Sequence, residues 1–176
     1  LLAVPLGALT GVVAAVRENT WGDRLLVGLS AVGVSMPSFW MALMMILLFS
    51  VTLGWLPASG QGSVAHLVLP TLVLAVGAVG TIARSARTGM IDVMKQDYIR
   101  TARAQGKTER NILLVHALPN ALIPVVTIIG LQFGWLLSGS FIVETVFSRQ
   151  GLGSTLINAI IDQDLPLVQG AVLMTS

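Results

Sequence analysis

The stretch "LLVGLSAVGVSMPSFWMALMMILLFSVTLGWLPASGQGSVAHLVLPTLVLAVGAVGTIA", residues 25–83, runs for 59 residues without a charged side chain. A helix needs about 20 apolar residues to cross a bilayer core of about 30 Å. The stretch is therefore long enough for two membrane crossings and a connection between them. Turn-forming residues near its middle predict where that connection lies: Pro57, Gly60, Gly62 and Pro70.

The rest of the chain follows the same pattern. Residues 111–143 form a second uncharged run, which fits one more crossing, so three complete spans are predicted. Residues 1–16 and 165–176 are also apolar but too short to cross, and we expect them to belong to two further spans that are cut. A mean hydropathy of +0.85 supports an all-α membrane protein. A soluble helical bundle would instead carry polar residues at helical spacing along its outer faces.

The basic residues predict how the spans are oriented. The connections 17–24, 84–110 and 144–164 hold two, seven and one of the ten Lys and Arg residues. Successive connections alternate sides, so 17–24 and 84–110 share one side, and 53–70 and 144–164 share the other. The positive-inside rule places the first pair in the cytoplasm.

Several residues inside the spans are candidates for helix packing or for a translocation path. Gly130, Gly134 and Ser138 recur at four-residue spacing, which lets helix backbones approach closely in lipid, and Gln132 is a nearby polar side chain. Packing is the default interpretation and a path the alternative. Pro37 is expected to interrupt and bend the first complete span.

The chain carries no recognisable catalytic or cofactor site. It has no cysteine, and its two histidines, His66 and His116, lack metal-ligand spacing, so both are interpreted as structural. No phosphate-cradling GxxxxGK[ST] loop is present. No ionisable residue lies in the middle of a predicted span, which argues against a proton-coupled carrier. We therefore expect a partner to supply energy and this chain to be no enzyme.

The tract "DYIRTARAQGKTER", residues 97–110, lies within the most basic connection. Asp97 is expected to cap a helix that runs from Tyr98 to residue 105, and Gly106 to end it in a left-handed conformation. Thr108 is expected to cap a second helix that ends at Pro119. An ordinary basic loop fixed to anionic lipid headgroups is the simpler alternative.

The order of residues in this tract favours a more specific interpretation. "YIRTARAQG", followed after nine residues by "HALP", resembles the cytoplasmic EAA coupling loop of ABC importer permeases. Gly106 matches the glycine of that pattern, Ala102 its second alanine, and Leu118 with Pro119 its closing pair. Three residues depart from the general pattern in the manner of the dipeptide and oligopeptide branch, where "RTARAKG" is usual: Arg100, Thr101 and His116.

Two further stretches resemble the same branch. Residues 34–60 are similar to the third span and outer loop of its first permease subunit, and residues 143–170 to the loop before its last span. The resemblance implies a transmembrane domain of the type I ABC importer fold over residues 1–176, lacking the first span and parts of two others, with a coupling loop at about 84–117.

The resemblance also implies partners and a location. It implies a homologous second permease, two cytoplasmic ATPase subunits that use ATP and Mg²⁺, an external peptide-binding protein and membrane lipid, but no nucleic acid. The location implied is the cytoplasmic membrane of a prokaryote, crossed several times. Relatives that carry nickel or glutathione share the motifs, so these solutes stay open. A carrier or channel that works alone and a non-transporting membrane scaffold are the remaining alternatives.

The same resemblance assigns roles to named residues. Ala102 and Ala104 would allow close approach to an ATPase subunit, and Arg100 and Arg103 would pair with its acidic residues. The full set expected to couple the chain to the ATPase is Asp97, Tyr98, Arg100, Thr101, Ala102, Arg103, Ala104, Gly106, Leu118 and Pro119.

A second set is expected on the opposite side, at an external gate beside the docked binding protein. It consists of Glu144, Phe147, Gly151 and Gly153. The two glycines in "RQGLG", residues 149–153, are expected to permit a tight turn, and an ordinary loop is the equal alternative.

Overall fold

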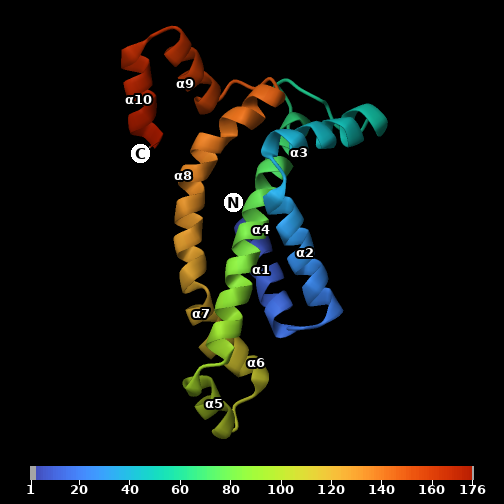
Figure 1. The fold of residues 1–176 in the computed structure, drawn as a ribbon, viewed down its shortest axis with the longest axis vertical. Coiled ribbons are helices and arrows are strands. Elements are labelled where there is room, and N and C mark those ends of the chain that lie inside the picture. Colours follow the sequence, from blue (N-terminus) through green and yellow to red (C-terminus); the bar gives the residue numbers. More distant parts are fainter. Residues whose placement is uncertain (1–2, 176) are drawn as a thin grey trace. The chain divides into compact units, whose positions relative to one another are not determined.

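A computed structural model describes the backbone of residues 3–175, together with all of their side chains except those of 133, 135–139, 174 and 175. Its regular structure is helical, with no strand among the described residues, so the all-α prediction is confirmed (Figure 1). The elements are α1 (Ala3–Val16), α2 (Trp21–Ser35), α3 (Ser38–Met45), the π-helix η1 (Ile46–Thr52), α4 (Ala65–Met94), α5 (Asp97–Ala104), α6 (Glu109–Asn111), the π-helix η2 (Ile112–Ala117), α7 (Leu118–Ala121), α8 (Ile123–Val146), α9 (Leu152–Ile161) and α10 (Leu165–Thr175).

The chain divides into two compact units, each built from two separate parts of the sequence. Unit 1 consists of Leu1–Ser35 and Val76–Gly130, and unit 2 of Met36–Ala75 and Leu131–Ser176. The long helices α4 and α8 each begin in one unit and end in the other. We describe the two units separately.

The centre of unit 1 is the close contact of α1 with α4. A Cβ atom built on Gly7 would lie 2.8 Å from Cβ of Ile82, and one on Gly11 would lie 2.7 Å from Cβ of Ala86. Gly7 and Gly11 are four residues apart and therefore lie on one face of α1. Their lack of a side chain lets the two backbones approach, as small residues at this spacing do between membrane helices.

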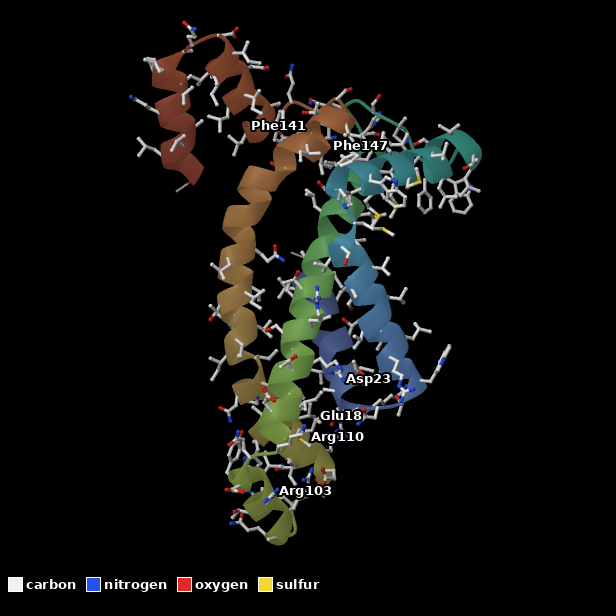
Figure 2. All side chains as sticks on the ribbon, viewed as in Figure 1. Glu18, Asp23, Arg103, Arg110, Phe141 and Phe147 are labelled. Carbon is white, nitrogen blue, oxygen red and sulfur yellow. The ribbon has the colours of Figure 1, made fainter. Side chains whose placement is uncertain are left out.

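An ion pair joins two connections of unit 1 that lie far apart in the sequence. Nε and Nη2 of Arg87 donate to the two carboxylate oxygens of Asp23 at 2.6 and 2.7 Å, and the Asp23 residue is only 2% exposed. Asp23 lies near Glu18 at the same end of the unit as Arg103 and Arg110 (Figure 2). The predicted pairing of connections 17–24 and 84–110 is thereby confirmed.

Unit 2 brings together the other two predicted connections. The amide of Gly60 donates to the carbonyl of Phe147 at 3.1 Å, and Nη1 of Arg149 lies 3.4 Å from the carbonyl oxygen of Gly60. Phe147 is buried in an apolar cluster with residues from α3, α4 and α8: Ala42, Leu69, Val73 and Val143. The prediction that these two connections share one side rested only on the alternation of successive connections. The contacts confirm that prediction.

Length and composition identify candidate spans among the described residues. α4 is long and apolar enough to cross a membrane by itself, which confirms one predicted span. Two more candidate spans result if each bent pair of helices is counted as a single span. One pair is α2 with Ser38–Thr52, and the other is Glu109–Ala121 with the first part of α8. The predicted interruption at Pro37 is confirmed, because α2 ends at Ser35 and Pro37 stands at the N-cap of α3.

Candidate functional site: the segment from Asp97 to Ala121

Helix α5 begins one residue earlier than the sequence suggested. Gln96, with extended backbone angles, occupies the N-cap, and Asp97 is already the first helical residue. The prediction that Asp97 caps the helix is therefore wrong. Its carboxylate instead stabilises the first turn of α5, because negative charge is favourable at the N-terminal end of the helix dipole. It also lies 3.5 Å from Arg100 in an exposed pair, which contributes little to stability.

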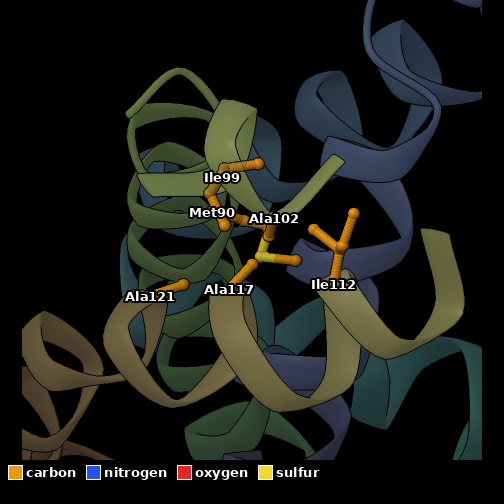
Figure 3. Packing of buried hydrophobic residues seen from close by; sticks show 6 residues of the cluster. All are labelled: Met90, Ile99, Ala102, Ile112, Ala117 and Ala121. Carbon is orange, nitrogen blue, oxygen red and sulfur yellow. The ribbon is translucent and has the colours of Figure 1, made fainter. Parts of the chain in front are cut away.

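The inner face of α5 packs on the chain itself. Ile99 is fully buried and Ala102 is 5% exposed. Both belong to an apolar cluster that holds α5 against α4 and the following helices (Figure 3), whose other members are Met90, Ile112, Ala117 and Ala121. The expectation that Ala102 offers close approach to a partner is thus wrong, since its methyl group fills this cluster. Ala104 is exposed and stays available.

The turn after α5 is a Schellman motif centred on Gly106. The amide of Gly106 donates to the carbonyl of Arg103 at 2.9 Å, and that of Lys107 to the carbonyl of Ala102 at 3.3 Å. Gly106 has a φ of +78°, as predicted, and no described atom lies within 4 Å of a Cβ built there. Conformation, and not lack of space, therefore favours glycine at this position.

Replacing Gly106 by valine is expected to abolish transport without preventing membrane insertion. A β-branched residue in the left-handed region costs at least about 1–2 kcal/mol, so the turn would open and α5 would change direction. Uptake by the assembled transporter is the measurement, with subunit abundance in the membrane as the check on insertion. Gly106→Asn is the matched control and should retain most activity, because asparagine tolerates this conformation. Normal uptake by the valine variant would refute the requirement.

A second contact fixes the angle between α5 and α6. Arg103 donates from Nε and Nη2 to the two carboxylate oxygens of Glu109 at 2.7 and 3.2 Å, and this hydrogen-bonded carboxylate raises the pKa of Arg103. Arg103 therefore has an acidic partner, Glu109, within its own chain. The sequence analysis had expected its acidic partner on the ATPase. Thr108 caps α6 as predicted and accepts from the amide of Asn111 at 3.4 Å.

A polar contact from Asn120 ties α5 to the end of η2. Its side-chain nitrogen donates to the hydroxyl of Tyr98 and to the carbonyl of His116, each at 3.0 Å. Nε2 of His116 lies 2.9 Å from Nζ of Lys107. The sequence interpretation did not single out Asn120, and the only available signal was a polar residue next to the closing proline. Tyr98 is thereby held in place although it is 43% exposed.

The closing Leu118 and Pro119 lie inside a continuing helical path and do not end it. The π-helix η2 precedes them, and α7 includes both and reaches Ala121. The expected helix end at Pro119 is therefore wrong by two residues. Proline is tolerated there because it occupies the first turn of α7, where its missing amide hydrogen has no required partner.

The outer side of this segment is polar and mixed in charge. Its exposed residues on α5 are Asp97, Tyr98, Arg100, Thr101, Arg103 and Ala104. The side chains of α5 are thus divided into an apolar set that anchors the helix and a polar set that a soluble protein can contact. The apolar set attaches α5 to α4, because Ile99 and Ala102 share the buried cluster with Met90.

The predicted external gate residues form a separate site in unit 2, where α8 meets α9. One carboxylate oxygen of Glu144 accepts from the hydroxyl of Ser140 at 3.0 Å, and the other accepts from the amide of Ser154 at 2.8 Å. Glu144 thereby satisfies an amide in the first turn of α9, where negative charge is favoured. Phe147 lies in the buried cluster of the same unit.

Gly151 and Gly153 lie where α9 approaches α8 closely, and neither has a positive φ. Gly151 has extended backbone angles that any residue can adopt, but a Cβ atom there would lie 2.5 Å from Cδ of Glu144. A Cβ on Gly153 would lie 2.8 Å from Cα of Phe141. The expectation of a tight turn is wrong, because the two glycines let α9 approach α8.

Replacing Glu144 by glutamine is expected to lower the stability of the subunit by about 1 kcal/mol, because a charged acceptor at the start of α9 is lost. Thermal unfolding of the full-length subunit in mild detergent measures the change. Thr145→Val is the control, since it removes only an exposed bond to the carbonyl of Phe141. Equal stabilities for the two variants would exclude a capping role for Glu144.

The small-residue stripe of the third predicted span shows no close backbone approach at its two glycines. A Cβ built on Gly130 or Gly134 meets no described atom within 4 Å beyond its own stretch of helix. Gln132 is half-buried, and the side chain of Ser138 lies outside the described residues. Both interpretations of this stripe, packing and a path, stay predictions.

No metal centre is visible in the part of the chain that the structure describes, since no three His, Asp or Glu side chains there gather closely enough to hold an ion. His66 makes a local contact of 2.8 Å from Nδ1 to the hydroxyl of Ser63.

Comparison with known proteins agrees with this architecture. The model of the family described as binding-protein-dependent transport system inner membrane component matches residues 4–176. A protein of Brucella abortus (strain 2308), named provisionally as a peptide transport system permease protein, is 44% identical over 180 residues. The glutathione transport system permease protein of Escherichia coli (strain K12) is 45% identical over 174 residues.

These alignments cover 98% and 99% of this chain and 57% of each relative, so the chain spans a little over half the length of the proteins it matches. The family match extends over the whole of the described fold, including the segment from Asp97 to Ala121. The chain belongs to the family of binding-protein-dependent transport system inner membrane components.

Proposed function

We propose that this chain is the translocation subunit of an ATP-driven importer that carries short peptides across the cytoplasmic membrane of a prokaryote. Separate ATPase subunits would hydrolyse ATP with Mg²⁺, and a homologous permease and an external binding protein would complete the machine. The family membership and the names of the relatives support this proposal.

The observation that carries the proposal is the construction of α5. An eight-residue helix presents polar side chains outward, while Ile99 and Ala102 join it to α4 through the buried cluster. The Schellman turn at Gly106 and the pair of Arg103 with Glu109 fix its direction. A push on α5 by a soluble ATPase would therefore move α4 without the helix deforming first.

Reconstitution tests the proposed function. The full-length subunit, purified in mild detergent with the proteins that accompany it, is placed in lipid vesicles with the binding protein outside and ATP at the ATPase side. Uptake of a labelled tripeptide that requires ATP would support the proposal. Tripeptide uptake that is equally fast without ATP, or purification of the active subunit alone, would favour a carrier or channel instead.

Glutathione is a second candidate substrate, because a relative of 45% identity is named for its transport. Glutathione is itself a short peptide with free charged ends. Competition between labelled tripeptide and unlabelled glutathione in the same vesicles distinguishes the two: strong competition by glutathione would assign it as the substrate.

A further inference from the structure

Helix α4 has two unlike faces in its unit 1 portion. One face is packed, with Ala78, Ile82, Ala83, Ala86 and Met90 each at most 5% exposed. The other face carries five polar residues that recur every three or four positions and so lie on one side of the helix: Thr81, Arg84, Ser85, Thr88 and Asp92. Three of these, Arg84, Thr88 and Asp92, are exposed.

This polar face borders a groove. Its five residues, with Gly89 from the same helix and Pro124 and Ile128 from α8, line a volume of about 430 Å³. Other helix faces of unit 1 expose apolar side chains, as Ile123, Val126 and Leu29 show at more than 60% exposure. Apolar surfaces suit acyl chains, whereas four of the five polar groove residues belong to the connection 84–110, whose polar side chains are expected to face water or protein.

Neither charged residue of the groove has an ion-pair partner among the described residues. Arg87 is locked to Asp23, but for Arg84, only three residues earlier, the described chain provides no ion pair. The carboxylate of Asp92 likewise has no ion-pair partner among the described residues. The groove thus offers one free cation and one free anion, eight residues apart, which corresponds to about 12 Å along the helix.

We propose that this groove binds a short zwitterionic peptide, with Arg84 contacting its terminal carboxylate and Asp92 its terminal ammonium group. The inference rests on the proposed function and names a binding site for the substrate. An extended peptide rises about 3.3 Å per residue, so three to four residues span the two charges. Asp92 lies nearer to α5, and the ammonium end of the peptide therefore points toward the coupling segment.

Water access to the groove is the first test. Single cysteines are introduced at Ser85 and Thr88 in a full-length subunit without other cysteines, within the assembled transporter. A charged, membrane-impermeant methanethiosulfonate is added to inside-out vesicles. We expect Ser85→Cys and Thr88→Cys to react at least about tenfold faster than Val126→Cys, because only a hydrated cysteine forms the reactive thiolate. Equally slow reaction at all three positions would overturn the proposal and indicate a face covered by lipid or protein.

Protection by peptides tests the two charges and needs neither ATP nor the binding protein. A free tripeptide is expected to protect Thr88→Cys, while its amidated and its acetylated forms require about tenfold higher concentration, as loss of one charge-assisted contact predicts. Adding Arg84→Gln should abolish the difference between free and amidated peptide, and Asp92→Asn that between free and acetylated peptide. Arg17→Gln, an exposed cation outside the groove, should change neither.

The results separate this inference from the proposed function. Equal protection by all three peptides, or differences that persist in Arg84→Gln, would overturn the groove assignment even if ATP-dependent uptake is observed. If the peptides protect Thr88→Cys in the expected order but no ATP-dependent uptake is observed, the groove is supported as a binding site and the proposed importer function is rejected.

Discussion

Replacing Ala102 by glutamate is expected to abolish peptide uptake and to weaken the attachment of α5 to unit 1. The Ala102 methyl group lies in the apolar cluster with Ile99 and Met90, and no cation of that cluster could pair with an introduced carboxylate. Burying a charged or unpaired polar group there costs several kcal/mol, about 3 or more. The helix would move out of the cluster, and its displacement would no longer reach α4.

The matched control lies two residues further along the same helix. Ala104 is exposed, so Ala104→Glu introduces the same side chain without burying it and should leave the subunit folded. Thermal stability in detergent, binding of the ATPase subunits and ATP-dependent uptake are compared for the two variants. Normal uptake by Ala102→Glu would refute the coupling of α5 to α4 through this cluster.

The sequence correctly predicted which connections lie together, because charge distribution and span length act over whole segments. The 59-residue uncharged run and the alternation of connections are insensitive to the detailed position of any residue. Contacts of Arg87 with Asp23, and of Gly60 with Phe147, place together the same connections that the charge pattern had paired. The bonds themselves could not be predicted, since their partners lie 64 and 87 residues apart.

Local backbone chemistry between Asp97 and Ala121 was predictable in part: Gly106 and Thr108 act as expected, whereas the cap at Asp97 and the helix end at Pro119 were wrong. Gly106 and Thr108 act through their own conformation and near neighbours, so their roles follow from sequence order. The face of α5 that packs against the rest of the chain could not be predicted from sequence order. An alanine on a short amphipathic helix suits an internal cluster and a partner's groove equally, and only the positions of Met90 and Ile112 show that Ala102 faces inward.

Glycine spacing was the least reliable signal. Gly130 and Gly134 show the expected four-residue spacing, but a Cβ built on either would have room, whereas Gly7 and Gly11, with the same spacing, make the close contact of α1 with α4. The four-residue spacing indicates that another helix can approach the backbone closely, but it does not identify that helix. In a chain with 18 glycines, tertiary structure is needed to decide which of them are used.

Replacing Asp23 by alanine is expected to destabilise unit 1 by about 2–3 kcal/mol. The substitution leaves the Arg87 guanidinium without its acceptor, and removal of one member of a buried pair typically costs about 3–5 kcal/mol. The lower value is expected here because the Arg87 side chain is 24% exposed and can reach water. The amide of Asn19, which donates to Asp23 at 3.0 Å, also loses its acceptor.

A second ion pair between the same two connections provides the control. Nζ of Lys95 lies 3.9 Å from Glu18, with both side chains well exposed, so Glu18→Ala should cost less than about 0.5 kcal/mol. Thermal unfolding of the full-length subunit in detergent measures both variants. The double variant Asp23→Leu with Arg87→Met should recover most of the lost stability, because it removes both charges and keeps the volume filled. Equal behaviour of Asp23→Ala and Glu18→Ala would show that the bidentate contact does not hold α2 to α4, and that apolar packing, including the close approach of α1 to α4 at Gly7 and Gly11, holds unit 1 together.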